Sequence, residues 1–160
     1  MRVCIGGALH PALGQAGPVG LWTPLLVPRI GYCEYNCTLC GQVCPTGAIK
    51  LLPLEKKRKT VIGLAVFDKD RCLPFAKKEE CLVCEEHCPT GEKAIVMEEK
   101  EILVDGEMRR LKFPKVIDKL CIGCGICETK CPVEGASAVR IINEGESRRK
   151  RSELLAGPYG

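Results

Sequence analysis

The sequence predicts an α+β protein built from repeated modules of short strands and helical turns, and three observations support this. First, 13 of the 160 residues are cysteine, and twelve of these fall into three groups with related spacing. Second, each group ends in Cys-Pro, and the flanks of the groups repeat as well. Third, the chain has only three Phe, three Tyr and one Trp, which is little material for a conventional core. We therefore expect the cysteines to bind groups that fill part of the interior.

Each of the three groups contains four cysteines followed by a proline. They are Cys33-x₃-Cys37-x₂-Cys40-x₃-Cys44 (group one), Cys72-x₈-Cys81-x₂-Cys84-x₃-Cys88 (group two) and Cys121-x₂-Cys124-x₂-Cys127-x₃-Cys131 (group three). The flank at 65–69, Ala-Val-Phe-Asp-Lys, precedes group two as Lys-Val-Ile-Asp-Lys at 115–119 precedes group three. This alignment identifies Cys72 as the first cysteine of group two, so an insertion at 73–80 explains the longer spacing.

By composition the chain divides into three parts. Residues 1–30 are rich in Gly and Pro and are expected to wrap a surface, residues 31–142 hold the motifs at 33–44, 72–88 and 121–131, and residues 143–160 form a basic tail that we expect to be mobile. The sequence predicts short strands at 48–52, 61–67, 94–97, 114–117 and 138–142. The pair Asp105-Gly106 predicts a hairpin turn between 101–104 and 107–111.

The cysteine spacings point to iron–sulfur chemistry. A cubane cluster needs four thiolates at tetrahedral corners, of which three can come from one tight loop and the fourth must arrive from another direction. The run C-x₂-C-x₂-C-x₃-C-P is the bacterial ferredoxin pattern, and group three matches it without deviation. Gly123 and Gly125 suit the sharp turns of such a loop, and Pro132 suits a chain that must leave its helical turn.

These motifs resemble those of the polyferredoxins, electron-carrying proteins built from repeated bacterial-type [4Fe–4S] modules. Within that group, Gly-Gln-Val-Cys-Pro-Thr-Gly-Ala-Ile at 41–49, the widened group two and Cys-Ile-Gly-Cys-Gly-Ile-Cys at 121–127 look most like the NapG/MauM ferredoxin-type proteins. The resemblance covers residues 31–142. It implies repeated ferredoxin-like modules, three [4Fe–4S] clusters, electron transfer along them, and redox protein partners that include a membrane quinol-oxidising protein.

Resemblance to two-cluster ferredoxins implies crossed ligation, in which the fourth cysteine of one group binds the cluster of another. Cluster A would then use Cys33, Cys37, Cys40 and Cys88, and cluster B would use Cys72, Cys81, Cys84 and Cys44. Cluster C would use Cys121, Cys124 and Cys127, with either Cys131 or Cys4 as its fourth ligand.

Cys4 leaves two alternatives open. Residues 1–9 parallel residues 41–49, because both read x-x-Val-Cys-x-x-Gly-Ala followed by Leu or Ile. Cys4 would then be the last cysteine of a fourth motif that begins upstream of Met1, and the chain would be a truncated four-motif protein. In the other alternative, Cys4 is a free buried thiol and Cys131 completes cluster C.

Other functional classes fit the sequence less well. Group one also contains the Cys-x₃-Cys-x₂-Cys signature of radical-SAM enzymes, but two further ferredoxin motifs leave no room for a substrate barrel. A structural zinc-binding protein is the alternative from another class, although closely packed cysteines followed by proline fit cubanes better. No catalytic triad, phosphate-binding loop or carboxylate pair stands out. The sequence therefore predicts an electron carrier and not an enzyme.

We expect the protein to act as a subunit or domain of a larger redox complex. The runner-up is a tightly bound electron-transfer subunit of a molybdenum or tungsten oxidoreductase or of a hydrogenase. No segment has the length of a membrane span or the pattern of a signal peptide. This leaves the compartment open between a cytoplasmic protein and one that is membrane-associated as part of a complex. No nucleic-acid partner is expected, and we draw no nucleic-acid conclusion from the net charge of +4. The basic runs 56–59 and 148–151 are either solvated or dock to an acidic partner or membrane surface.

Overall fold

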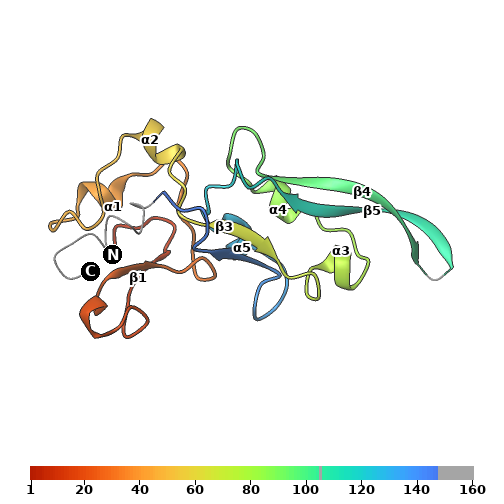
Figure 1. The fold of residues 1–160 in the computed structure, drawn as a ribbon, viewed down its shortest axis with the longest axis horizontal. Helices are drawn as coiled ribbons and strands as arrows, with labels where there is room; N and C mark the ends of the chain where they lie inside the picture. The colour runs from red at the N-terminus through yellow and green to blue at the C-terminus, as the bar shows by residue number, and fades with distance from the viewer. Residues whose placement is uncertain (105, 148–160) are drawn as a thin grey trace.

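The structure is a computed structural model that describes residues 1–104 and 106–147, so most of the expected basic tail, including the run 148–151, lies outside the described residues. It mixes short helices with short strands and carries a long hairpin that projects from one end (Figure 1). The elements are β1 (Leu9–Pro11), η1 (Pro18–Gly20), β2 (Pro24–Leu26), α1 (Leu39–Gln42), α2 (Leu54–Arg58), β3 (Leu64–Phe67), α3 (Leu73–Ala76), α4 (Val83–Glu86), β4 (Ile95–Val104), β5 (Glu107–Val116), α5 (Ile126–Lys130) and β6 (Val139–Ile142).

Groups two and three lie within one paired unit. The strand before group two, β3, pairs antiparallel with the strand after group three, β6, while β4 pairs antiparallel with β5. Each group therefore sits between two strands that pair with the strands of the other group. This pairing brings the two helical turns α4 and α5 into contact. The predicted strands at 61–67 and 138–142 are each confirmed over their last four residues, as β3 and β6.

The long hairpin joins segments that the sequence predicts as separate short strands. Strands β4 and β5 run without interruption over ten residues each, from Ile95 opposite Val116 to Val104 opposite Glu107. Gly106 at the turn has a φ of 86°, a left-handed conformation that glycine adopts at little cost. The hairpin predicted around residues 105 and 106 is therefore confirmed. Phe113 of β5 packs on Phe75 of α3 with ring centroids 4.8 Å apart, which fixes the base of the hairpin to group two.

The first 30 residues form a small hairpin that is anchored to α5. Leu9 of β1 lies opposite Leu26 of β2. The Arg29 guanidinium then donates hydrogen bonds to the backbone carbonyls of Glu128, Cys131 and Val133, at 3.1, 3.4 and 2.9 Å. Because these carbonyls belong to the end of α5 and the chain after it, the N-terminal segment reaches group three.

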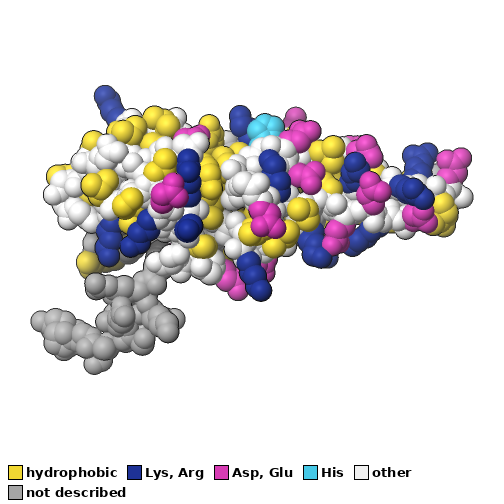
Figure 2. All heavy atoms as spheres, turned by 90° about the horizontal axis from the view of Figure 1, so that it is seen from above, with side chains coloured by type: hydrophobic (Ala, Val, Ile, Leu, Met, Phe, Trp, Pro, Cys, Tyr) yellow, Lys and Arg dark blue, Asp and Glu magenta, His cyan; other side chains and the backbone are white. Residues whose placement is uncertain are grey.

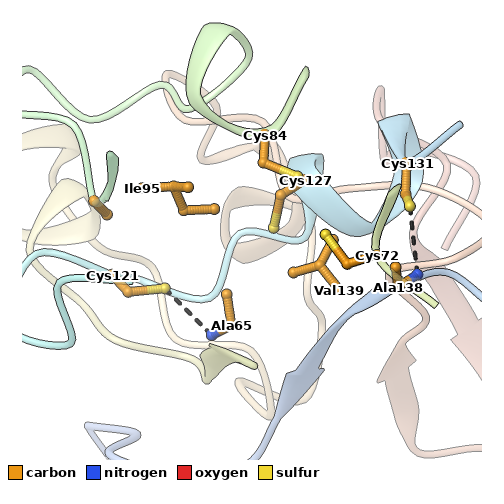
Figure 3. Packing of buried hydrophobic residues seen from close by; sticks show 10 residues of the cluster. Ala65, Cys72, Cys84, Ile95, Cys121, Cys127, Cys131, Ala138 and Val139 are labelled. Carbon is orange, nitrogen blue, oxygen red and sulfur yellow. Dashed lines mark hydrogen bonds between the residues drawn. The ribbon is translucent and has the colours of Figure 1, made fainter. Parts of the chain in front are cut away.

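Among the described residues, the buried core consists largely of cysteine and alanine. Five cysteines are at most 9% exposed, and Ala65, Ala94 and Ala138 are each 2% exposed between them. Figure 3 shows these sulfur atoms around Ile95 and Val139, which are among the few larger buried side chains. The expectation of a thin conventional core is confirmed. Small alanines leave the space around the sulfur atoms that a bound group would need.

Three local predictions differ from the structure. The segment 48–52 is not a strand, and no strand of the described residues pairs with it. Two short helices for which the sequence analysis predicted no secondary structure, α2 and α3, form at the basic run 56–59 and within the insertion at 73–80. Within the described part of the chain, no helix is both long and apolar enough to cross a membrane.

Candidate iron–sulfur centres

One cavity combines group three with the last cysteine of group two. Its lining includes Cys88, Cys121, Cys124 and Cys127, and we call it the Cys88 cavity. Cys127 lies on α5, Cys121 and Cys124 lie on the loop before it, and Cys88 enters from the end of α4. The backbone N–H of Ala65 donates to Cys121 Sγ at 3.4 Å, which is the kind of contact that stabilises a charged sulfur.

A second cavity combines group two with the last cysteine of group three. Its lining includes Cys72, Cys81, Cys84 and Cys131, and we call it the Cys131 cavity. The backbone N–H of Ala138 donates to Cys131 Sγ at 3.4 Å (Figure 3). Each helix thus contributes to both cavities. Cys84 on α4 lines the Cys131 cavity and Cys88, four residues later, lines the Cys88 cavity, whereas Cys127 on α5 lines the Cys88 cavity and Cys131 lines the Cys131 cavity. The contact between α4 and α5 places the two cavities side by side.

A third cavity combines group one with Cys4. Its lining includes Cys4, Cys33, Cys37 and Cys40, and we call it the Cys4 cavity. The backbone N–H of Cys33 donates to the carbonyl of Cys124 at 2.8 Å. This hydrogen bond joins a cysteine of the Cys4 cavity directly to a cysteine of the Cys88 cavity. The three cavities therefore follow the order Cys4 cavity, Cys88 cavity, Cys131 cavity.

Cys44 lines none of these three cavities. It lies at a separate hollow with Met1, Val3 and Trp22 among the lining residues. Its Sγ accepts the backbone N–H of Ile49 at 3.3 Å and lies 3.7 Å from the Thr46 hydroxyl. Cys88 has the same Cys-Pro-Thr sequence and a Sγ–hydroxyl distance of 3.2 Å to Thr90. Cys44 thus has hydrogen-bond donors like those of Cys88, but it lacks the three neighbouring cysteines that a cluster would need.

The grouping in the structure differs from the sets that the resemblance implies. Cys88 lies with group three and not with group one, and Cys44 does not lie with group two. Cys131 completes the cavity of group two, and Cys4 joins group one. The flanks at 65–69 and 115–119 carry the signal for this grouping, because they mark groups two and three as the equivalent pair.

Burial makes charged thiolates costly in these cavities. Desolvation raises the pKa of Cys84 to about 12 and the pKa of Cys72 and of Cys124 to about 11. It raises the pKa of Cys127 further still. Thiolates at these positions need a neighbouring positive charge, which a metal bound to the sulfur supplies.

Other cysteines have groups nearby that favour the thiolate. Burial raises the pKa of Cys88, but the Thr90 hydroxyl and the backbone N–H groups of Thr90, Ala94 and Ile95 outweigh it and bring the pKa below its usual value. Burial also raises the pKa of Cys33, and the Lys57 ammonium opposes this increase by its charge and by hydrogen bonding. These donors are the means by which the chain can stabilise added negative charge on a cluster.

The arrangement fits cubane clusters better than single metal ions. No three His, Cys, Asp or Glu side chains within residues 1–104 and 106–147 are grouped as ligands of one ion. A cubane places its four thiolates farther apart, because each thiolate binds a different iron. Gly123 and Gly125 have φ values of 70° and 86°, so the loop makes the turns expected for a cluster-binding loop.

Comparisons with known proteins agree with this chemistry. Residues 32–92 match the 4Fe-4S dicluster domain family, and residues 114–135 match the 4Fe-4S binding domain family. Residues 32–92 and 114–135 therefore carry ferredoxin-type 4Fe-4S domains, and these two segments hold all three cysteine groups. The dicluster match spans groups one and two, whereas the cavities of the structure combine groups two and three.

The particular relatives confirm the resemblance to the NapG/MauM proteins. Over 89% of its length the chain is 35% identical to the methylamine utilization ferredoxin-type protein MauM of Methylorubrum extorquens. Over the same share it is 31% identical to the ferredoxin-type protein NapG of Haemophilus influenzae. The chain spans 62% of that MauM protein and 50% of that NapG protein. A comparison with solved structures finds no match.

Proposed function

We propose that the protein carries single electrons through three [4Fe–4S] clusters, one in each of the Cys4, Cys88 and Cys131 cavities. The ligands would be Cys4, Cys33, Cys37 and Cys40 for the first cluster, Cys88, Cys121, Cys124 and Cys127 for the second, and Cys72, Cys81, Cys84 and Cys131 for the third. The observation that carries this proposal is that twelve of the 13 cysteines line these three cavities, four to each. A further hollow is lined by Cys33, Cys37, Cys40 and Cys124 and lies between the Cys4 and Cys88 cavities, so it adds no further cysteine to the ligand sets.

The chain's own residues would order the clusters and adjust their potentials. A bound [4Fe–4S] cluster supplies a site that takes up and releases one electron. The hydrogen bond from Cys33 N–H to the Cys124 carbonyl holds the first two cavities together, and α4 with α5 holds the second beside the third. The N–H groups of Ala65 and Ala138 stabilise charge on the sulfur atoms, while apolar walls exclude water.

The protein would exchange electrons with separate donor and acceptor proteins as part of a larger redox assembly. This partner role is supported by the similarity to the MauM and NapG ferredoxin-type proteins. The alternative is a small subunit bound permanently to a molybdenum or tungsten oxidoreductase or to a hydrogenase. Co-purification of a pterin- or nickel-containing subunit would favour this alternative over a relay.

Cys44 has its own place in the proposal. It is the last cysteine of group one, as Cys131 is the last of group three, and both accept a backbone N–H from a few residues further on. We expect it to remain unligated when residues 1–160 form three clusters. It would become a ligand only with three thiolates that these residues do not supply.

Paired substitutions test the ligand sets. Cys88→Ala and Cys124→Ala should each remove one cluster and leave about 8 iron per chain, and the double variant should also keep about 8, because both residues bind the same cluster. Cys88→Ala with Cys37→Ala should leave about 4, because two clusters are lost. If the Cys88/Cys124 double variant instead kept about 4 iron and the Cys88/Cys37 double variant about 8, Cys88 would be a ligand of the group one cluster. Cys44→Ala is the matched control and should retain all iron, and circular dichroism checks that each variant is folded.

A further inference from the structure

Basic side chains gather around α2 with few acidic neighbours. Residues 33–62 contain five basic side chains, Lys50, Lys56, Lys57, Arg58 and Lys59, and two acidic ones, Glu34 and Glu55. In Figure 2, seen from the side on which α2 lies, blue side chains outnumber magenta ones at the left end, whereas both colours alternate along the hairpin at the right. We call the exposed Lys50, Lys56 and Lys59 the α2 face.

Within the described part of the chain, no ion pair neutralises the lysines of the α2 face. Among ion pairs between described residues, five lie on the β4–β5 hairpin and one joins Arg58 to Glu55, at 3.7 Å. None of them involves the three lysines of the α2 face. Their positive charge is therefore available to a partner, whereas the hairpin satisfies its charges internally.

The α2 face lies at one end of the row of cavities. Lys50 and Lys57 line a hollow to which Cys33, Cys37, Cys40 and Cys124 also contribute. A molecule that docks on α2 is thus placed beside the Cys4 cavity, the first of the row. The other end of the row carries the opposite charge, since residues 68–93 contain seven acidic and five basic side chains.

We propose that the α2 face is the docking surface for an acidic redox protein, which exchanges electrons with the cluster of the Cys4 cavity. This inference rests on the proposed electron-transfer function and adds the place of exchange and the charge of the partner. Leu51, which is 63% exposed and follows Lys50 directly, supplies an apolar contact within a charged rim, as protein interfaces commonly have. An anionic membrane would also attract the lysines, but lipid headgroups accept no electron, so the position beside the cavity favours a protein.

The test measures how the reduced holoprotein is oxidised by two small cobalt complexes of opposite charge. The anionic oxidant is [Co(EDTA)]⁻ and the cationic oxidant is [Co(NH₃)₆]³⁺, and stopped-flow absorbance follows the clusters. At an ionic strength of about 0.01 M, Lys56→Glu with Lys59→Glu should lower the ratio of anionic to cationic rates at least tenfold. The difference should shrink at about 0.2 M, where screening is stronger.

A matched double variant separates local from overall charge. Arg109→Glu with Lys112→Glu changes the net charge equally but lies on the hairpin, so it should change the ratio less than twofold. Equal effects of the two double variants would overturn the proposal, and so would no effect of either. An oligoglutamate peptide should slow oxidation by [Co(EDTA)]⁻ in the unaltered protein and leave the Lys56/Lys59 variant unaffected.

Two outcomes distinguish a failure of the docking proposal from a failure of the proposed electron-transfer function. If the protein holds no reducible cluster, the proposed function fails before the docking surface is tested. If clusters are present and rates do not depend on the α2 face, only the docking proposal fails. Binding to vesicles with anionic phospholipid, lost in the Lys56/Lys59 variant and without competition by oligoglutamate, would replace the acidic protein by a membrane surface.

Discussion

Replacing Lys57 by methionine should lower the reduction potential of one cluster and leave the other two nearly unchanged. The Lys57 Nζ donates hydrogen bonds to the carbonyls of Glu34 and Tyr35, the latter at 3.0 Å, and its charge also acts on the Cys33 thiol. A reduced cluster carries one more negative charge than an oxidised one. Because the ammonium stabilises the reduced form, its removal makes reduction less favourable.

The size of the shift follows from Coulomb's law. Taking about 6 Å between the ammonium and the added electron and an effective dielectric constant of about 20, the interaction is about 3 kcal/mol. For a one-electron couple this corresponds to about 120 mV, since 59 mV is a tenfold change in the equilibrium constant. Lys57 is only partly buried, so solvent screening reduces the expected shift to about 60 mV.

An anaerobic redox titration followed by electron paramagnetic resonance gives the midpoint potential of each cluster. Lys57→Met should lower one potential and retain all iron. Lys56→Met is the matched control, because it removes the same charge from an exposed neighbour on α2 and should shift the potentials much less. Equal shifts in the two variants, or a rise in potential for Lys57→Met, would refute the reasoning.

Two further predictions concern Cys44 and the group three loop. The backbone N–H of Ile49, followed by the Thr46 hydroxyl, lowers the pKa of Cys44, so its thiolate fraction at pH 7 exceeds that of an ordinary cysteine. Iodoacetamide at pH 7 should therefore alkylate the holoprotein at Cys44, as peptide mass spectrometry would show, and alkylation at another cysteine would contradict the ligand sets. Gly123→Ala should destabilise the protein by at least about 2 kcal/mol, because its φ is 70° and a Cβ would lie 2.4 Å from the Gly63 carbonyl oxygen. Urea titration of the cluster absorbance should show this loss, and Gly91→Ala, which meets open space, should have little effect.

Local features of the fold could be predicted from the sequence where they depend on neighbouring residues. The pair Asp105-Gly106 was sufficient to predict the hairpin, because two-residue turns between strands favour a glycine in the left-handed conformation, which Gly106 adopts. The segment 48–52 has the composition of a strand, but a strand needs a partner, and none lies beside it among the described residues. Helix α2 contains Lys, Arg and Leu, which are good helix formers, and this signal for a helix at 54–58 was missed.

The cysteine groups could be recognised from spacing, but their combination into cavities could not. Each cavity takes three cysteines from one loop and one from elsewhere in the chain, and spacing describes only the loop. Chain order favoured pairing group one with group two. The strand pairing of β3 with β6 instead combines groups two and three, and the only sequence signal for this pairing was the repeated flank. Cys4 is an example of the same kind, since its match to residues 41–49 indicated a fourth ligand of cluster C, whereas in the structure it lies beside the cysteines of group one.

The most direct test of the central claim is the content of iron, zinc and acid-labile sulfide in protein purified without oxygen. Three clusters in three four-cysteine cavities predict about 12 iron and 12 sulfide per chain, with no zinc. About 8 of each would contradict the claim that all three cavities hold clusters. Zinc without sulfide would contradict electron transfer itself and indicate a structural metal protein.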